Sequence, residues 1–158
     1  FALMREIREW FDGPVALSGS IAHGASVLAA QAMGADLAYI GSAFIATKEA
    51  NAVEGYKENI VEAKASDIVY SSLFTGVHGN YLRQSIVKAG MDPDNLPEGD
   101  ISTMNFGSGG NTEAKAWKDI WSAGQSVVAV QRVEGAEEII ARLRAEYLQS
   151  LAVPSFGP

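Results

Sequence analysis

Residues 15 to 44 constrain the fold more than any other part of the sequence. Two short apolar runs, VAL at 15–17 and LAYI at 37–40, flank a helix of small residues predicted over 24–33. Neither run alternates polar with apolar residues, which is typical of parallel strands that are buried on both faces. The order strand, loop, helix, strand, loop therefore predicts a βαβ unit in an α/β protein.

Each predicted strand ends in a short loop of glycine and serine. Ser18, Gly19 and Ser20 follow the first strand, and Gly41 and Ser42 follow the second. Loops after neighbouring parallel strands meet at one sheet edge and lead to helix N-termini, whose free N–H groups favour anions. Glycine allows a close backbone approach, and serine hydroxyls donate to phosphate oxygens. The pair of loops predicts a phosphate site, although each loop alone is also typical of an ordinary turn.

The rest of the chain divides into a covering segment and a terminal helix. We expect unit 1–47 to hold the βαβ segment, 48–125 to be mainly helical with a flexible loop at 90–111, and 126–158 to carry a terminal helix and a frayed tail. The patterns predict helices over 2–11, 46–64, 81–89, 112–121 and 135–151, and a strand over 68–74. In the first helix the expected packing face is Leu3, Ile7, Trp10 and Phe11, and in the last helix the expected buried stripe is Ile139, Ile140, Leu143, Tyr147 and Leu148. Trp117 and Trp121, four residues apart, are expected in the core, and the acidic run EGAEE at 134–138 is expected to be a solvated helix face.

Composition narrows the class of function. The chain has 12 Lys+Arg against 19 Asp+Glu, a formal charge of −7, and its basic residues are scattered, which argues against nucleic acid or acidic membranes as partners. It has no cysteine, and its two histidines, His23 and His78, lie far apart in sequence, so we expect no metal site. With no membrane-length apolar run and no secretory signal pattern, we expect a cytoplasmic protein.

The first 50 residues resemble the C-terminal half of the nitronate monooxygenase family, formerly called 2-nitropropane dioxygenases. In that family a Gly-Gly-Ile turn after the seventh barrel strand and a Gly-Thr turn after the eighth bind the FMN phosphate. This sequence has Ser18-Gly19-Ser20-Ile21 and Gly41-Ser42-Ala43-Phe44 at the matching places. The resemblance implies the last two βα units of a (β/α)8 barrel, with FMN as cofactor and Ser18, Gly19, Ser20, Gly41 and Ser42 around its phosphate.

The resemblance continues through FTGVHGNYLRQSI and WSAGQ, which look like the family's segment that covers the flavin. It makes His78 and Gln125 candidates for substrate contact, each against the plainer reading of a turn residue and a helix cap. The family's catalytic histidine would lie before Phe1, so the catalytic residue is unknown. His23, at the loop-to-helix junction, is expected to be a surface or capping residue.

The resemblance implies that the parent protein oxidises alkyl nitronates with O2. Two alternatives stay open: an enoyl-ACP reductase that uses NAD(P)H and shares the phosphate loops, and a truncated fragment without catalysis. An oligomer is possible. We expect the 158-residue chain alone to be poorly soluble or molten and to show no turnover, because a barrel cut after its sixth strand leaves strand edges unpaired.

Overall fold

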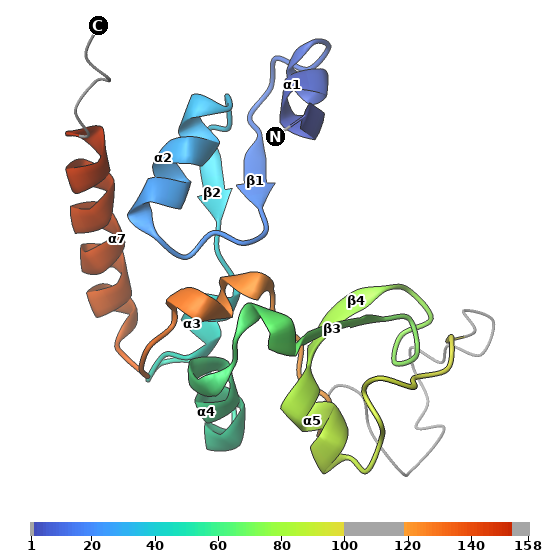
Figure 1. Cartoon of the computed structure of the whole chain (residues 1–158). Helices are drawn as coiled ribbons and strands as arrows, with labels where there is room; N and C mark the ends of the chain where they lie inside the picture. Colours follow the sequence, from blue (N-terminus) through green and yellow to red (C-terminus); the bar gives the residue numbers. More distant parts are fainter. Residues whose placement is uncertain (1, 100–118, 153–158) are drawn as a thin grey trace, which may run out of the picture.

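The computed structural model describes residues 2–99 and 119–152, which form a βαβ unit, a second group of short helices with a hairpin, and a long terminal helix (Figure 1). The helices are α1 Ala2–Arg8, α2 Gly24–Ala32, α3 Ser42–Ile45, α4 Glu54–Glu62, α5 Arg83–Lys88 and α7 Ala136–Leu151, with 3-10 helices η1 Ala65–Asp67 and η3 Gln125–Ala129. The strands are β1 Ala16–Ser18, β2 Leu37–Tyr39, β3 Ile68–Ser71 and β4 Gly79–Leu82. This confirms the predicted α/β class.

Strands β1 and β2 form the predicted parallel pair, joined by α2. Their register places Ala16 opposite Leu37 and Ser18 opposite Tyr39. Because parallel strands run in the same direction, the loops that follow them begin at the same edge of the sheet. The βαβ unit predicted from residues 15 to 44 is thus confirmed.

The prediction that these strands are buried on both faces was wrong. Leu17 and Ala38 pack under α2, in a cluster that also contains Met4, Ile21, Ala30 and Ala35. The side chains of Ala16, Ser18, Leu37 and Tyr39 point the other way and form what we call the open sheet face, where Leu37 is 63% and Tyr39 67% exposed. Runs of three or four residues are too short for hydropathy alternation to distinguish burial on one face from burial on two.

The helix α1 is shorter than predicted, and its packing face differs. It ends at Arg8 instead of residue 11, and Met4 is its buried residue. Leu3 and Trp10, which were expected on the packing face, are 67% and 72% exposed. Met4 lies on the side that meets the βαβ unit, so the apolar stripe of the sequence did not identify the contact.

The covering segment contains a hairpin as well as helices. β3 pairs antiparallel with β4, and Tyr81 and Leu82, predicted to open a helix, instead lie opposite Val69 and Ile68. Of the predicted helix over 46–64, only Glu54–Glu62 is helical, as α4, and the short helix α3 lies before residue 46. Trp121 joins this segment, since its ring stacks on Tyr56 with centroids 5.2 Å apart. The predicted core role of Trp121 is confirmed, whereas Trp117, residues 100–111 of the predicted loop and most of the 112–121 helix lie outside the described residues.

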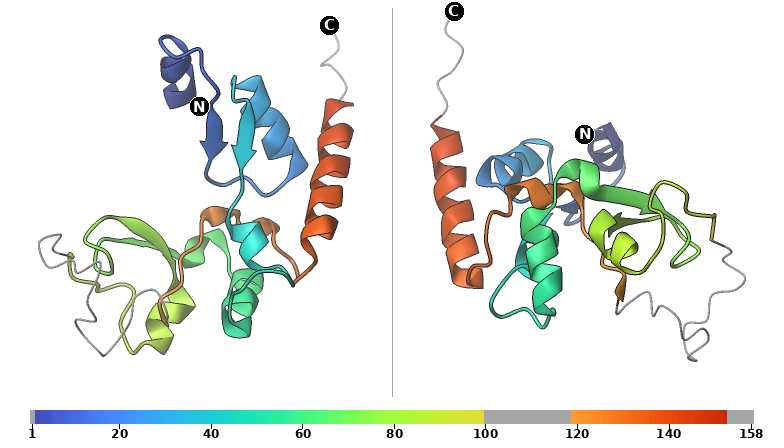
Figure 2. Two further views of the ribbon diagram at one scale, coloured as in Figure 1. Left: turned by 180° about the vertical axis from the view of Figure 1, so that it is seen from behind. Right: turned by 60° about the horizontal axis from the view of Figure 1, so that its bottom comes forward.

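Helix α7 returns to the βαβ unit and lies beside α2 in all views (Figures 1 and 2). The predicted helix is confirmed within one residue, and Ile139 is buried as expected. Ile140 and Leu148 are exposed, so the predicted stripe was too wide. The division into units 1–47, 48–125 and 126–158 stays a prediction. Over residues 2–99 and 119–152, every helix is too short or too polar to cross a bilayer.

Candidate functional site

The two glycine–serine loops begin side by side. The Ser18 hydroxyl, at the end of β1, donates to the carbonyl oxygen of Tyr39, at the end of β2, over 3.4 Å. From there the chain turns through Gly19 and Ser20 on one side and through Gly41 and Ser42 on the other. The structure therefore brings the predicted loop residues to one sheet edge.

The first loop has an unusual backbone. Gly19 has φ +101° and Ser20 has φ +55°, both in the left-handed region that favours glycine. A Cβ built on Gly19 would meet no atom within 4 Å, so open space lies against this turn. Ile21 and Ala22, which follow, are buried and anchor the loop.

The second loop pairs open space with a fixed hydroxyl. A Cβ built on Gly41 would also meet nothing within 4 Å, and its φ of −107° is one that any residue adopts. The buried Ser42 hydroxyl accepts a hydrogen bond from the Gly124 N–H at 2.9 Å. Within the described residues no acceptor takes the proton of this hydroxyl, so it can donate to an anion at the loop.

The helix α2 does not offer its N-terminus to an anion, contrary to the sequence argument. It begins at Gly24, whose N–H donates to Oε2 of Glu146 at 2.8 Å. His23 caps the same end, since its Nδ1 accepts from the Ala25 N–H at 3.0 Å. The capping role expected of His23 is confirmed. A carboxylate from α7 already occupies this helix end, so only the loop backbone and the start of α3 remain for a phosphate.

A charge network beside the loops was missed in the sequence. Glu134, whose side chain is 7% exposed, accepts from Arg142 Nε and from Arg142 Nη2, at 3.2 and 3.1 Å, and pairs with Arg132 at 2.8 Å. Arg142 also donates to Glu146 at 3.2 Å. Burial works against the charged guanidinium, but the hydrogen bonds to Glu146 and Glu134 outweigh it and raise the pKa of Arg142.

Part of this network has a sequence signal. The prediction that the run EGAEE at 134–138 is a solvated helix face was wrong for Glu134, which is buried. The spacing of Arg142 and Glu146, four residues apart on one helix, is the pattern of a helical ion pair. Because Glu134 lies outside α7, its partner is fixed by the tertiary fold and not by local spacing.

The two substrate candidates lie in different surroundings. Gln125 is exposed at the start of η3, directly after Gly124, whose N–H bonds to Ser42. The chain therefore brings Gln125 close to the second loop. His78 is exposed in the β3–β4 hairpin, where its ring stacks on Tyr70 with centroids 4.7 Å apart. Among the described residues no contact joins His78 to either loop.

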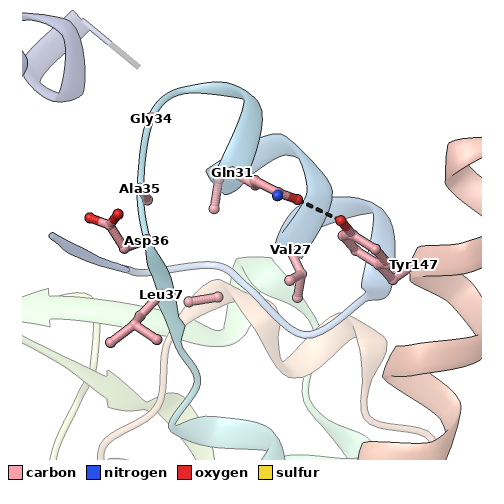
Figure 3. A pocket seen from close by; sticks show the side chains of 9 residues that line it. Val27, Gln31, Gly34, Ala35, Asp36, Leu37 and Tyr147 are labelled. Atoms are coloured by element: carbon pink, nitrogen blue, oxygen red, sulfur yellow. Dashed lines mark hydrogen bonds between the residues drawn. The ribbon is translucent and has the colours of Figure 1, made fainter. Parts of the chain in front are cut away.

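A pocket of about 590 Å³ lies elsewhere, at the start of β2 (Figure 3). Val27 and Gln31 of α2, Leu37 of β2 and Tyr147 of α7 line it, and the Tyr147 hydroxyl donates to Gln31 Oε1 at 2.5 Å. The glycine–serine loops follow the opposite ends of the strands, so this pocket is separate from them. In the part of the chain that the structure describes, no three His, Asp or Glu side chains are grouped to bind a metal ion.

The chain is similar in sequence to proteins of one family. A family profile described as nitronate monooxygenase matches residues 1–146. A curated nitronate monooxygenase from Paraburkholderia phytofirmans is 32% identical over 96% of this chain, which spans only 42% of that protein. A probable nitronate monooxygenase from Staphylococcus haemolyticus is 25% identical over 79% of this chain and 36% of its own length.

Solved structures share the fold. A nitroalkane oxidase from Streptomyces ansochromogenes superposes with a TM-score of 0.71 at 24% identity, covering 95% of this chain and 44% of its own. FabK from Thermotoga maritima superposes with a TM-score of 0.66 at 21% identity, covering 94% of this chain and 49% of its own. The chain thus spans less than half the length of the proteins that it matches. The match of the family profile across residues 1–146 shows that the chain belongs to the nitronate monooxygenase family.

Proposed function

We propose that the whole protein containing these residues is an FMN-dependent oxidoreductase that oxidises alkyl nitronates with O2. In this proposal β1, α2 and β2 belong to the last two βα units of a (β/α)8 barrel, and their loops hold the FMN phosphate. Family membership supports the class of reaction. The observation that carries the cofactor site is the open space at Gly19 and Gly41 beside the Ser42 hydroxyl.

The residues present fit a phosphate group. Both glycines leave room for phosphate oxygens to reach the backbone, and the Ser42 hydroxyl has a proton to donate. Ser18 supports the turn through its bond to Tyr39, and the left-handed Gly19 and Ser20 set the path of the first loop. When bound, FMN supplies the electron transfer, and the chain supplies binding and orientation.

Gln125 and His78 remain the proposed substrate contacts. Gln125 has the stronger support, since its neighbour Gly124 is bonded to the proposed phosphate residue Ser42. An amide at this place can donate to or accept from an anionic nitronate. His78 would need the hairpin to carry it over the flavin.

The variant Gly41→Val tests the phosphate site in the complete protein. Its φ suits valine and its Cβ meets no protein atom, so the fold tolerates the side chain while the space for the phosphate is filled. We expect the purified variant to lack the yellow colour and the visible absorbance of FMN. Ala32→Val, an exposed change at the far end of α2 from the loops, is the matched control and should keep its flavin. Undiminished FMN content in Gly41→Val would overturn the proposal.

The alternative of an NAD(P)H-dependent enoyl-ACP reductase uses the same phosphate loops, so the loop variants cannot distinguish the two. Stopped-flow reduction of the flavin can. We expect reduction by an alkyl nitronate and not by NADH or NADPH. Rapid reduction by a nicotinamide alone would favour the reductase, and FMN bound without reduction by either would favour a protein without catalysis.

A further inference from the structure

We propose that Glu134, Arg142 and Glu146, which we call the α7 charge network, position the two phosphate loops relative to each other. The inference rests on the proposed FMN site and assigns positioning residues to it. None of the three is expected to touch the cofactor. Each instead fixes backbone that lies a few residues beyond a loop.

The network fixes the chain after the first loop. Arg142 Nη1 reaches the carbonyl oxygen of Ala22 at 3.5 Å, and Glu146 accepts from the N–H of Gly24 at 2.8 Å. These two atoms lie two and four residues beyond Ser20. A Cβ on Gly24 would lie 2.1 Å from the backbone nitrogen of Tyr147. The backbones of α2 and α7 are therefore in direct contact here, with no room for a side chain between them.

The same network fixes the chain after the second loop. Glu134 pairs with Thr47 in a parallel bridge: its carbonyl accepts from the Lys48 N–H at 3.1 Å, and its own N–H donates to the Ala46 carbonyl at 3.4 Å. This backbone follows α3, which begins at Ser42. The Glu134 side chain binds Arg142 at the same time. One arginine therefore connects the segments that leave both loops.

Charge suits this role better than apolar packing. The buried Glu134 carboxylate and the half-buried Arg142 guanidinium must keep their hydrogen-bond geometry, because a broken pair leaves the carboxylate with an uncompensated charge. The planar guanidinium of Arg142 donates to Glu134 and to Glu146 in fixed directions. An apolar contact has no preferred direction and would allow the segments to slide. Supporting residues of this kind determine how closely a binding site holds its geometry.

The network is not itself an anion site. It lines a pocket of about 230 Å³ together with His23, Gln131 and Arg132. Glu134 and Glu146 already bind Arg142, and Arg132 pairs with Glu134, so the two carboxylates and two guanidinium groups balance. The pocket offers no excess positive charge to a phosphate. The geometry therefore points to positioning.

The test compares FMN with riboflavin, which lacks the phosphate, in the complete protein and in Arg142→Met. Methionine keeps much of the apolar volume but removes both ion pairs. We expect the affinity for FMN to fall about tenfold, while the affinity for riboflavin, measured by fluorescence quenching, stays unchanged. The loss would thus appear as a smaller FMN-to-riboflavin affinity ratio.

Two controls separate positioning from simple destabilisation. Arg144→Met changes an exposed arginine on the same helix and should leave the ratio unchanged. Ile139→Val, in the buried contact of α7, should lower the melting temperature without changing the ratio. If Arg142→Met does not fold, Glu146→Gln replaces it, since the amide oxygen still accepts from Gly24 while the ion pair with Arg142 is lost.

Each outcome has one meaning. A reduced ratio in Arg142→Met or Glu146→Gln, with both controls unchanged, supports the inference. An unchanged ratio in the folded variants, while Gly41→Val abolishes the preference for FMN, overturns the inference and leaves the phosphate site standing. A Gly41→Val protein that keeps its preference for FMN overturns the proposed site itself.

Discussion

Ser20 adopts a backbone conformation that its side chain disfavours. Its φ of +55° is left-handed, which costs a non-glycine residue about 1–2 kcal/mol, while glycine loses about 0.4–1 kcal/mol more conformational entropy on folding. We predict that Ser20→Gly raises the free energy of unfolding by about 0.5–1 kcal/mol, measured by urea denaturation without cofactor. Ser26→Gly, inside α2, should have the opposite sign, and a destabilised Ser20→Gly would contradict the prediction.

Gly24 is required for a different reason, the close approach of two helices. A Cβ there would lie 2.4 Å from the Leu143 carbonyl oxygen as well as 2.1 Å from the Tyr147 nitrogen. Backbone atoms cannot turn aside as a side chain can, so Gly24→Ala must separate α2 from α7. We predict a loss of about 2 kcal/mol or more in the free energy of unfolding, which exceeds the usual gain of alanine over glycine in a helix.

Gly41→Ala is the matched control for that experiment, because its Cβ meets open space. It should change the free energy of unfolding of the cofactor-free protein by no more than about 0.5 kcal/mol. Equal losses in the two alanine variants would contradict the contact between α2 and α7.

At the scale of single residues, the sequence predicted where the two loops lie but not the network. Gly19, Ser20, Gly41 and Ser42 stand at one sheet edge as expected, because glycine and serine directly after a strand have a local meaning, and their phosphate contacts stay a prediction. Glu134 could not be found that way, since its burial depends on Arg142 and on the backbone at Thr47, both distant in sequence. The occupation of the α2 N-terminus by Glu146 was hidden for the same reason.

Among the elements, α1 is joined to the sheet by an ion pair in addition to the buried Met4. Arg8 donates to the carboxylate of Asp36 at 2.5 Å and to the Gly34 and Gly13 carbonyls, and Asp36 also accepts from the Val15 N–H at 2.8 Å. The Val15 N–H and the Arg8 guanidinium hold the pKa of Asp36 below its ordinary value of 3.8. The joint therefore links α1 to the starts of both β1 and β2.

This joint predicts an acid-dependent stability. Because the pKa of Asp36 is lower in the folded chain, its contribution is full above the ordinary value and is lost as pH falls through the folded-state pKa. The melting temperature of the protein should exceed that of Asp36→Asn near neutral pH, and the difference should shrink between about pH 4 and about pH 2.

The control for the joint is Glu6→Gln. Glu6 is exposed on α1, and within the described residues its carboxylate makes no hydrogen bond or ion pair. Its melting curves should follow those of the parent protein at every pH. A difference between the parent and Asp36→Asn that persists unchanged in acid would mean that the carboxylate charge does not hold α1.

Element types were more predictable than element limits and packing. The terminal helix was predicted within one residue, because sixteen residues give several turns of apolar periodicity. The hairpin was found only in part, since Tyr81 and Leu82 satisfy a helical pattern locally but gain ladder hydrogen bonds from β3. Tertiary pairing overrode the local preference there.

For the molecule as a whole, the open sheet face is the feature that a sequence pattern could least reveal. One face of β1 and β2 lies under α2, and the other presents Leu37 and Tyr39, at 63% and 67% exposure, to the surroundings. The chain spans less than half of the relatives that it matches. Whether a strand residue is buried depends on all the elements that pack on the strand. The three or four residues of the strand itself do not determine this.

The open sheet face leads to a prediction for the 158-residue chain prepared alone. Contiguous exposed apolar side chains on a sheet favour self-association and bind apolar dyes. We predict that the isolated chain enhances the fluorescence of 1-anilinonaphthalene-8-sulfonate and sediments as a concentration-dependent mixture.

The double variant Leu37→Ser with Tyr39→Ser should reduce both effects, because it changes two neighbouring positions of that face. Val53→Ser with Leu148→Ser, which are 62% and 53% exposed and lie before α4 and in α7, should reduce them less. A wild-type chain that stays monomeric and binds no dye would show that this face does not drive association.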